Sequence, residues 1–172
     1  MDSFIATVNS NDEVIGFKSK SEVHSKGVLH RAFSIFIFNS KGELMLQQRS
    51  HGKYHSPGLW TNTCCSHLPE TLSMKEIVHH RLTEEMGFDT ELKYVGKFHY
   101  QVNFDNGLTE NEIDHIYVGF YEKNPSPNPK EVEAFRWINI SSLLAEIEEQ
   151  PQNFTYWLKY ILHNHSDLLK IE

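Results

Sequence analysis

The sequence predicts an α+β fold, an α/β/α sandwich in which a mixed sheet carries a central helix and C-terminal helices. Three observations predict this architecture. Short runs of β-branched and aromatic residues recur along the chain, one well-capped helix interrupts them, and two helical segments follow the last run. The chain has 172 residues, of which 39% are hydrophobic, so we expect one domain over residues 1–172.

Four strands are expected in the first part of the chain. They are the β-rich segments that end at turn-forming residues, at positions 4–8, 14–17, 32–38 and 43–49. The connection over residues 50–72 contains Pro57-Gly58 and Pro69 and shows no clear periodicity. Connections of this length are uncommon in compact domains unless they serve a function, so we expect part of the functional site there.

A helix over residues 74–86 follows this connection. Ser73 and Glu76 have the spacing of a capping box, and Gly87 stands where a C-cap glycine belongs. The apolar stripe of the helix consists of Met74, Val78 and Leu82. Arg81 and Glu85 fall within this stripe, so the two charges form either an internal ion pair or part of a buried polar site.

The rest of the chain is expected to form three further strands and two closing helices. The strands lie near residues 91–103, 111–121 and 133–138, and the helices at residues 141–149 and 154–164. A proline-rich segment over residues 125–129 is expected to be a rigid surface turn before the last strand.

The charge and cysteine content exclude several classes of protein. The net charge is -7 without a Lys/Arg run, so we expect no nucleic-acid partner, and a bound anion needs local cations or a metal. Neither a membrane-spanning stretch nor a signal-like N-terminus is apparent, so we expect a soluble cytoplasmic protein without a membrane partner. The two cysteines, Cys64 and Cys65, are adjacent and are expected to be thiols.

Five residues form a candidate metal site. Glu110 and Glu112 lie two positions apart in an expected strand, so both carboxylates face one side and raise each other's pKa unless a cation lies between them. Alone, the pair would equally suit a solvent-covered strand edge. Together with His24, His30 and His67, it forms a set that suits octahedral coordination of a divalent transition metal. Each histidine by itself is more often a surface or hydrogen-bonded residue.

Taken together, these segments resemble the type I isopentenyl-diphosphate Delta-isomerases, which have a Nudix-like fold, over about residues 14–157. The resemblance rests on the following motifs in this order: His24 with His30-Arg-Ala-Phe-Ser34, Pro57-Gly-x-Trp60-Thr-Asn62, Cys65-x-His67, Arg81-x-x-x-Glu85-x-Gly87 and Glu110-Asn-Glu112. Such a set in this order is highly specific.

The resemblance implies an enzyme of isoprenoid biosynthesis with two divalent ions. The enzyme would interconvert isopentenyl diphosphate and dimethylallyl diphosphate by protonation and deprotonation through a tertiary carbocation. One Mn²⁺ or Zn²⁺ would be bound by His24, His30, His67, Glu110 and Glu112. A Mg²⁺ ion would be held by the substrate diphosphate and Glu85, and the diphosphate-binding cations would be Lys20, Arg49, Lys53 and Arg81.

The resemblance also implies where the protons move. Cys65 would act on one face of the substrate, and Glu112, helped by Tyr100, on the other. Trp157 would stabilise the carbocation through its π face. Which group donates the first proton stays open, and so does the exact allylic or homoallylic diphosphate. We expect a monomer, with a dimer as the alternative.

Two other functions compete with this interpretation. A Nudix hydrolase would explain Glu84–Phe88, which fits the end of that family's motif. Aligned on it, however, the motif's Arg-Glu pair falls on His80 and Arg81, its other Glu on Leu72 and its Gly on Ser66. The missing carboxylates are the metal ligands that would activate a water molecule. A non-enzymatic metal-binding module would need neither the thiol, nor the tyrosine, nor four cations.

Overall fold

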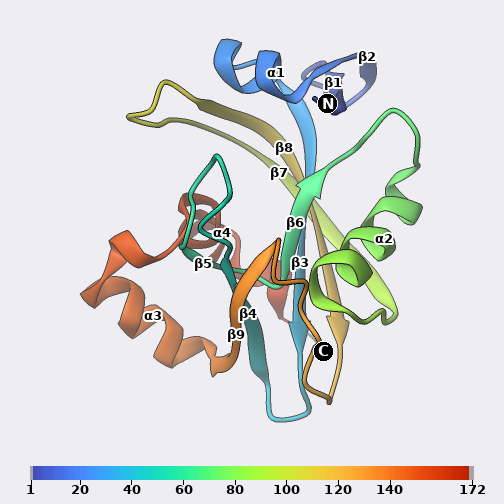
Figure 1. Cartoon of the computed structure of the whole chain (residues 1–172). Coiled ribbons are helices and arrows are strands. Elements are labelled where there is room, and N and C mark those ends of the chain that lie inside the picture. The colour runs from blue at the N-terminus through green and yellow to red at the C-terminus, as the bar shows by residue number, and fades with distance from the viewer. Residues whose placement is uncertain (1, 171–172) are drawn as a thin grey trace.

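The computed structural model describes residues 2–170, and within them a nine-stranded sheet is covered by helices on both faces (Figure 1). The elements, in chain order, are β1 (Phe4–Val8), β2 (Val14–Ser19), α1 (Lys20–Lys26), β3 (His30–Phe38), β4 (Glu43–Arg49), β5 (Trp60–Thr61), β6 (Cys64–His67), α2 (Met74–Met86), β7 (Leu92–Asn103), β8 (Thr109–Phe120), β9 (Val132–Asn139), α3 (Ile140–Glu149), the 3-10 turn η1 (Pro151–Asn153), α4 (Tyr156–Asn164) and the 3-10 turn η2 (Ser166–Leu169). α2 covers one face of the sheet, and α3 and α4 cover the other (Figure 1). The expected α+β sandwich is therefore confirmed.

β3 is the strand that connects the parts of the sheet. It pairs in parallel with β8, with His30 opposite Glu112 at one end and Phe38 opposite Phe120 at the other. On its other edge it pairs antiparallel with β6, and this register places Ala32 opposite His67. Residues far apart in the sequence therefore meet around the N-terminal end of β3.

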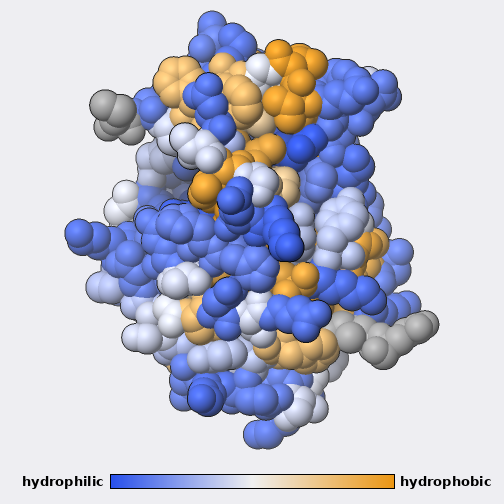
Figure 2. All heavy atoms as spheres, turned by 90° about the vertical axis from the view of Figure 1, so that its right-hand side faces the viewer, coloured by the Kyte–Doolittle hydropathy of each residue, from blue (hydrophilic) through white to orange (hydrophobic). Residues whose placement is uncertain are grey.

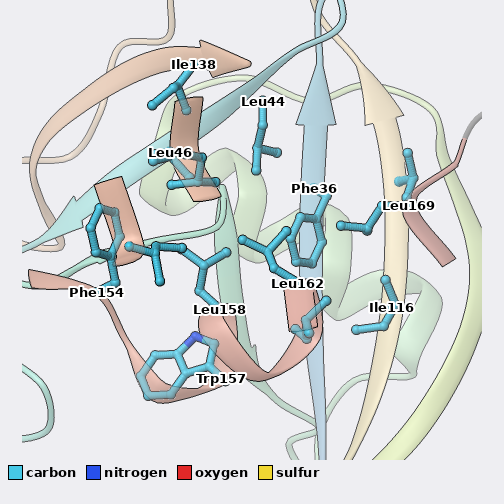
Figure 3. Packing of buried hydrophobic residues seen from close by; sticks show 14 of the residues in the cluster. Phe36, Leu44, Leu46, Ile116, Ile138, Phe154, Trp157, Leu158, Leu162 and Leu169 are labelled. Atoms are coloured by element: carbon cyan, nitrogen blue, oxygen red, sulfur yellow. The ribbon is translucent and has the colours of Figure 1, made fainter. Parts of the chain in front are cut away.

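Alternate residues of β3 pack into two apolar layers. Phe36 lies in the layer of α3 and α4, together with Leu158 and Trp157 (Figure 3). Phe33 and Ile35 lie in the opposite layer, against α2. Burial of each such side chain contributes roughly 1.5–3 kcal/mol. The strand that carries the site is therefore fixed from both faces.

Helix α2 has the bounds that the sequence predicts. The Ser73 side chain accepts from the backbone N–H of Glu76, whose carboxylate accepts from the backbone N–H of Ser73 in return. Gly87 ends the helix at a φ of 74°. A Cβ at this position would collide with the backbone of Ser126, so both conformation and space require glycine here.

Two parts of the structure differ from the sequence-based expectation. Helix α1 was not expected, although Ser19 caps its first turn and Gly27 ends it at a φ of 64°. The connection over residues 50–72 is not free of regular structure, because it contains β5 and β6. The helix has seven residues and the two strands have two and four. Elements this short show no measurable periodicity.

The surface is hydrophilic over most of the face that α2 forms, and apolar side chains gather near the β1–β2 hairpin (Figure 2). The exposed apolar residues of this hairpin are Phe4, Val14, Ile15 and Phe17. Among the helices within residues 2–170, none combines the length and the apolar composition of a transmembrane span.

Candidate active site

Three histidines and two glutamates come together at the N-terminal end of β3. His24 lies on α1, His30 on β3, His67 on β6, and both Glu110 and Glu112 lie on β8. One ligand atom from each of the five residues lies within 4.8 Å of the others. The pairing of β3 with β6 and β8 brings these strands together, and the period of two along β8 directs both carboxylates to one side.

The imidazole rings direct their Nε2 atoms toward the carboxylates. Nε2 of His30 lies 3.1 Å from Oε1 of Glu112, and Nε2 of His67 lies 3.0 Å from the same oxygen. Nε2 of His24 lies 3.3 Å from Oε2 of Glu110. Nδ1 of His24 contacts the carbonyl of Lys20 at 2.7 Å, and Nδ1 of His30 contacts that of Val28 at 2.8 Å. A carbonyl oxygen accepts only, so each Nδ1 carries a proton and each Nε2 is available as a metal ligand.

The donor set fits a divalent metal ion. Nε2 of His24 and Oε2 of Glu110 are buried and lack a hydrogen-bond partner among residues 2–170. Buried polar atoms without partners are rare, and a shared cation would satisfy both. Imidazole nitrogens combined with carboxylate oxygens suit a transition metal of intermediate softness. The cluster can therefore hold a metal ion.

The pKa values show how strongly these residues interact. Burial opposes the ionisation of Glu112, but hydrogen bonds with His30 and His67 outweigh it and hold the pKa of this carboxyl well below its ordinary value. Burial also lowers the pKa of His67, to about 3. For His30, contact with Glu112 outweighs burial and raises the pKa. A proton and a metal ion would therefore compete for Nε2 of His30.

A cavity that opens to solvent adjoins the cluster, with about 590 Å³ of empty space including open solvent. The expected site residues that line it are Lys20, Arg49, Lys53, Cys65, His67, Arg81, Glu85, Tyr100, Glu110, Glu112 and Trp157. His24 and His30 are buried next to it, so every candidate site residue lies in or beside one cavity.

Two of the four cations of the cavity, Arg81 and Lys53, pair with carboxylates. The other two lie over aromatic rings, Lys20 over Tyr54 and Arg49 over Trp157. Arg81 contacts Glu84 at 2.6 Å and also pairs with Glu85, and Lys53 pairs with Glu131. The internal ion pair that was one alternative for α2 thus exists, and it also faces the cavity. The pKa of Lys20 is lowered by burial first, then by the charges of Lys53 and Arg49. This region of the cavity is therefore electrostatically prepared for an anion, despite the net negative charge of the protein.

Cys65 and the Tyr100–Glu112 pair approach the cavity from opposite edges of β3. Cys65 lies on β6, and Glu112 lies on β8, where Oε2 accepts a hydrogen bond of 2.8 Å from the Tyr100 hydroxyl. Burial raises the pKa of the Cys65 thiol to about 12, which keeps it protonated at neutral pH. Cys64 is fully buried in the apolar layer under α2 and does not line the cavity.

Sequence reasoning missed two residues that enclose the cluster. Tyr54 lines the cavity, and its hydroxyl lies 3.1 Å from Nδ1 of His24. His55, next to it, is buried and contacts Glu110. Both lie in the connection that was expected to contain part of the site, but no periodicity or spacing distinguishes them there.

The sequence and the fold of this chain both match a known class of proteins. Residues 28–158 match the family model described as NUDIX domain. The same fold occurs in a protein of Deinococcus radiodurans, with a TM-score of 0.78 and 17% identity over 93% of this chain and 97% of that one. It also occurs in a MutT protein of Methanosarcina mazei, with a TM-score of 0.67 and 16% identity over 83% and 96%. The chain therefore has a Nudix fold.

Two relatives in sequence identify the family to which this chain belongs within that class. The chain is 45% identical to "Isopentenyl-diphosphate Delta-isomerase 2" of Photorhabdus laumondii, over 95% of this chain and 92% of that protein. It is 46% identical to "Isopentenyl-diphosphate Delta-isomerase" of Serratia proteamaculans, over 94% and 90%. The chain belongs to the isopentenyl-diphosphate Delta-isomerase family.

Proposed function

We propose that this protein interconverts isopentenyl diphosphate and dimethylallyl diphosphate in cytoplasmic isoprenoid biosynthesis, with residues 1–172 acting as one domain and as a monomer. The observation that carries the proposal is that the thiol of Cys65 and the carboxylate of Glu112 face one cavity from opposite edges of β3. Movement of a double bond needs this pair, because one carbon gains a proton and another loses one.

The diphosphate binds at the cationic part of the cavity. Arg49 and Arg81 offer planar donors that match phosphate oxygens, whereas Lys20 and Lys53 act as point charges. Glu85 lies beside Arg81 and would hold a Mg²⁺ ion that the diphosphate also binds. Substrate binding would therefore replace the carboxylate partners of Arg81 and Lys53 with phosphate oxygens.

The hydrocarbon part of the substrate lies between Cys65 and Glu112. A proton is added to the terminal carbon from one side, which produces a tertiary carbocation. A proton is then lost from a different carbon on the other side, so the reaction neither consumes nor releases protons overall. Tyr100 keeps Oε2 of Glu112 oriented toward the substrate, and the π face of Trp157 stabilises the cation by roughly 2 kcal/mol.

The five-residue cluster fixes the orientation of Glu112. We propose that it binds Mn²⁺ or Zn²⁺, since three imidazoles and two carboxylates suit either ion. Such an ion would fix the position of the carboxylate and tune its acidity. His30 and His67 hold Oε1, so Oε2 remains available to Tyr100 and to the substrate.

The test is turnover of isopentenyl diphosphate in deuterated water with Mg²⁺ and Mn²⁺. We expect a deuterated allylic isomer, no phosphate release, and loss of activity in Cys65→Ala and Glu112→Gln. Cys64→Ala is the matched control and should stay active, because this thiol does not line the cavity. Phosphate release without the isomer would instead support a Nudix hydrolase, and full activity of Cys65→Ala would overturn the proposed proton transfer.

A further inference from the structure

His55 is buried within a loop whose neighbouring side chain is exposed. It lies in the connection between β4 and β5, and 5% of its surface is accessible, compared with 52% for Tyr54. Burying the polar side chain of a loop histidine costs free energy unless the ring interacts with a partner in the buried site. Its position therefore indicates a specific partner.

That partner is Glu110. Nε2 of His55 lies 3.0 Å from Oε1 of Glu110. The contact is not aligned as a hydrogen bond, so within residues 2–170 this buried nitrogen has no hydrogen-bond partner. The other oxygen of Glu110, Oε2, faces His24 and His30 at 3.3 Å and 3.7 Å.

The two carboxylates of the cluster are arranged in the same way. Glu112 directs Oε1 to the histidines and Oε2 to the hydroxyl of Tyr100. Glu110 directs Oε2 to the histidines and Oε1 to His55. His55 thus lies at the outer oxygen of Glu110 as Tyr100 lies at the outer oxygen of Glu112, but only the Tyr100 contact is aligned as a hydrogen bond.

Packing keeps the ring of His55 in place. Its centroid lies 4.5 Å from that of Phe104 and 5.7 Å from that of Trp157. The backbone is fixed as well, because its carbonyl accepts from Nη2 and Nε of Arg49 at 2.9 Å and 3.3 Å. A ring packed against two aromatic side chains, with its backbone anchored, can direct one nitrogen at a fixed point.

We propose that His55 is a positioning residue that holds Glu110 in its metal-binding orientation. The inference rests on the metal cluster of the proposed function, and it adds an outer partner for one of the five ligands. Hydrogen bonds to ligating groups typically raise metal affinity 10- to 100-fold. His55 itself lies outside the group of five mutually close ligands.

Metal affinity of the substrate-free protein tests this role. Mn²⁺ binding would be measured by calorimetry for the wild type, His55→Phe and His55→Gln. Phenylalanine keeps the ring packing but has no donor, so we expect affinity to fall about 10- to 100-fold. Glutamine places an amide nitrogen near the original Nε2, and we expect affinity within about threefold of wild type. His51→Gln, an exposed histidine of the same loop, is the matched control.

Two further readouts separate positioning from other roles. Thermal unfolding without metal reports the folding of each variant. If His55→Phe is unfolded, His55→Asn replaces it, because the shorter amide of asparagine cannot reach Glu110. The absorption spectrum of bound Co²⁺ reports the ligand number, and it should be unchanged in His55→Gln. The proposal is overturned if Mn²⁺ affinity is unaltered in His55→Phe or His55→Asn. It is also overturned if His55→Gln does not restore that affinity.

The calorimetric result does not depend on turnover. If the isomerase assay fails while glutamine restores metal affinity, the proposed function is wrong and the role of His55 stands. If the isomerase assay succeeds but glutamine does not restore metal affinity, the proposed function stands and the proposed role of His55 is wrong. Excess Mn²⁺ should also restore kcat in His55→Phe with little change in KM, because the diphosphate-binding cations remain in place.

Discussion

The hydroxyl of Tyr100 donates to one oxygen of Glu112 at 2.8 Å, and the other oxygen of that carboxylate faces two histidines. In the proposed function the carboxylate is thereby divided between two tasks, because metal binding would use Oε1 and proton transfer would use Oε2. Removal of one partner should affect one task and spare the other.

Tyr100→Phe should separate these tasks. We expect kcat to fall by about 100-fold, since a positioned proton-transfer partner contributes roughly 10²–10⁴-fold. Mn²⁺ affinity should change little, because Oε1 keeps both histidine contacts. Steady-state kinetics and calorimetry on the same preparation would measure both, and a parallel loss of affinity and kcat would contradict the division.

The two adjacent thiols should differ in reactivity. Burial raises the pKa of both Cys64 and Cys65, but only the side chain of Cys65 reaches the cavity. We expect iodoacetamide to modify Cys65 slowly in the folded protein and Cys64 only after unfolding, as peptide mass spectrometry would show. Cys64→Ala should cost about 1 kcal/mol of stability. Modification of Cys64 before Cys65 would show that the thiols are placed differently.

Glu85→Gln should weaken the response to Mg²⁺. Glu85 is buried, accepts from the Gln47 amide at 2.8 Å and pairs with Arg81. Loss of its charge should raise the Mg²⁺ concentration for half-maximal activity at least about tenfold, which corresponds to about 1.4 kcal/mol. Mn²⁺ affinity of the cluster should be unaffected. An unchanged Mg²⁺ titration would mean that Glu85 only anchors Arg81.

Asp12, away from the cavity, should make stability depend on pH. It accepts from Arg31 at 2.8 Å and Lys97 at 2.7 Å, and His115 lies 2.8 Å away. Burial opposes ionisation of Asp12, but these contacts outweigh it and lower its pKa. Because the folded-state pKa is lowered, the stabilisation is fully present above the unfolded value of about 3.9 and is lost as pH falls through the folded value.

Asp12→Asn isolates this contribution, since asparagine tolerates the φ of 62° at this position. Urea unfolding near neutral pH should show a loss of roughly 2 kcal/mol, and the difference from wild type should shrink below about pH 4. The pKa of His115 is lowered, chiefly by burial, so a His115→Gln background removes its titration from the comparison. If the difference in free energy of unfolding between Asp12→Asn and wild type stays constant over this pH range, the stabilisation by Asp12 is not ionic.

The sequence predicted the long elements and the residues that come together in or beside the cavity. The run of β-branched and aromatic residues in β3 and the capping residues of α2 are local signals, so both elements were placed close to their observed bounds. The helix that carries His24 was missed because seven residues are too few to show a stripe. The role that we propose for His55 depends on packing against Phe104 and Trp157. Such tertiary contacts leave no trace in local sequence.

The parallel pairing of β3 with β8 also determines the stage of folding at which the site forms. His30 and Glu112 are 82 positions apart, and all three histidines leave the ribosome before either glutamate. Closing so long a loop is slow and entropically costly, so the ligands cannot assemble until the sheet is essentially complete. The ion would therefore bind last, to a finished fold. It would then stabilise the whole domain by about 2.7 kcal/mol at a concentration 100 times its dissociation constant. Chelation should accordingly speed global unfolding and not merely loosen one loop.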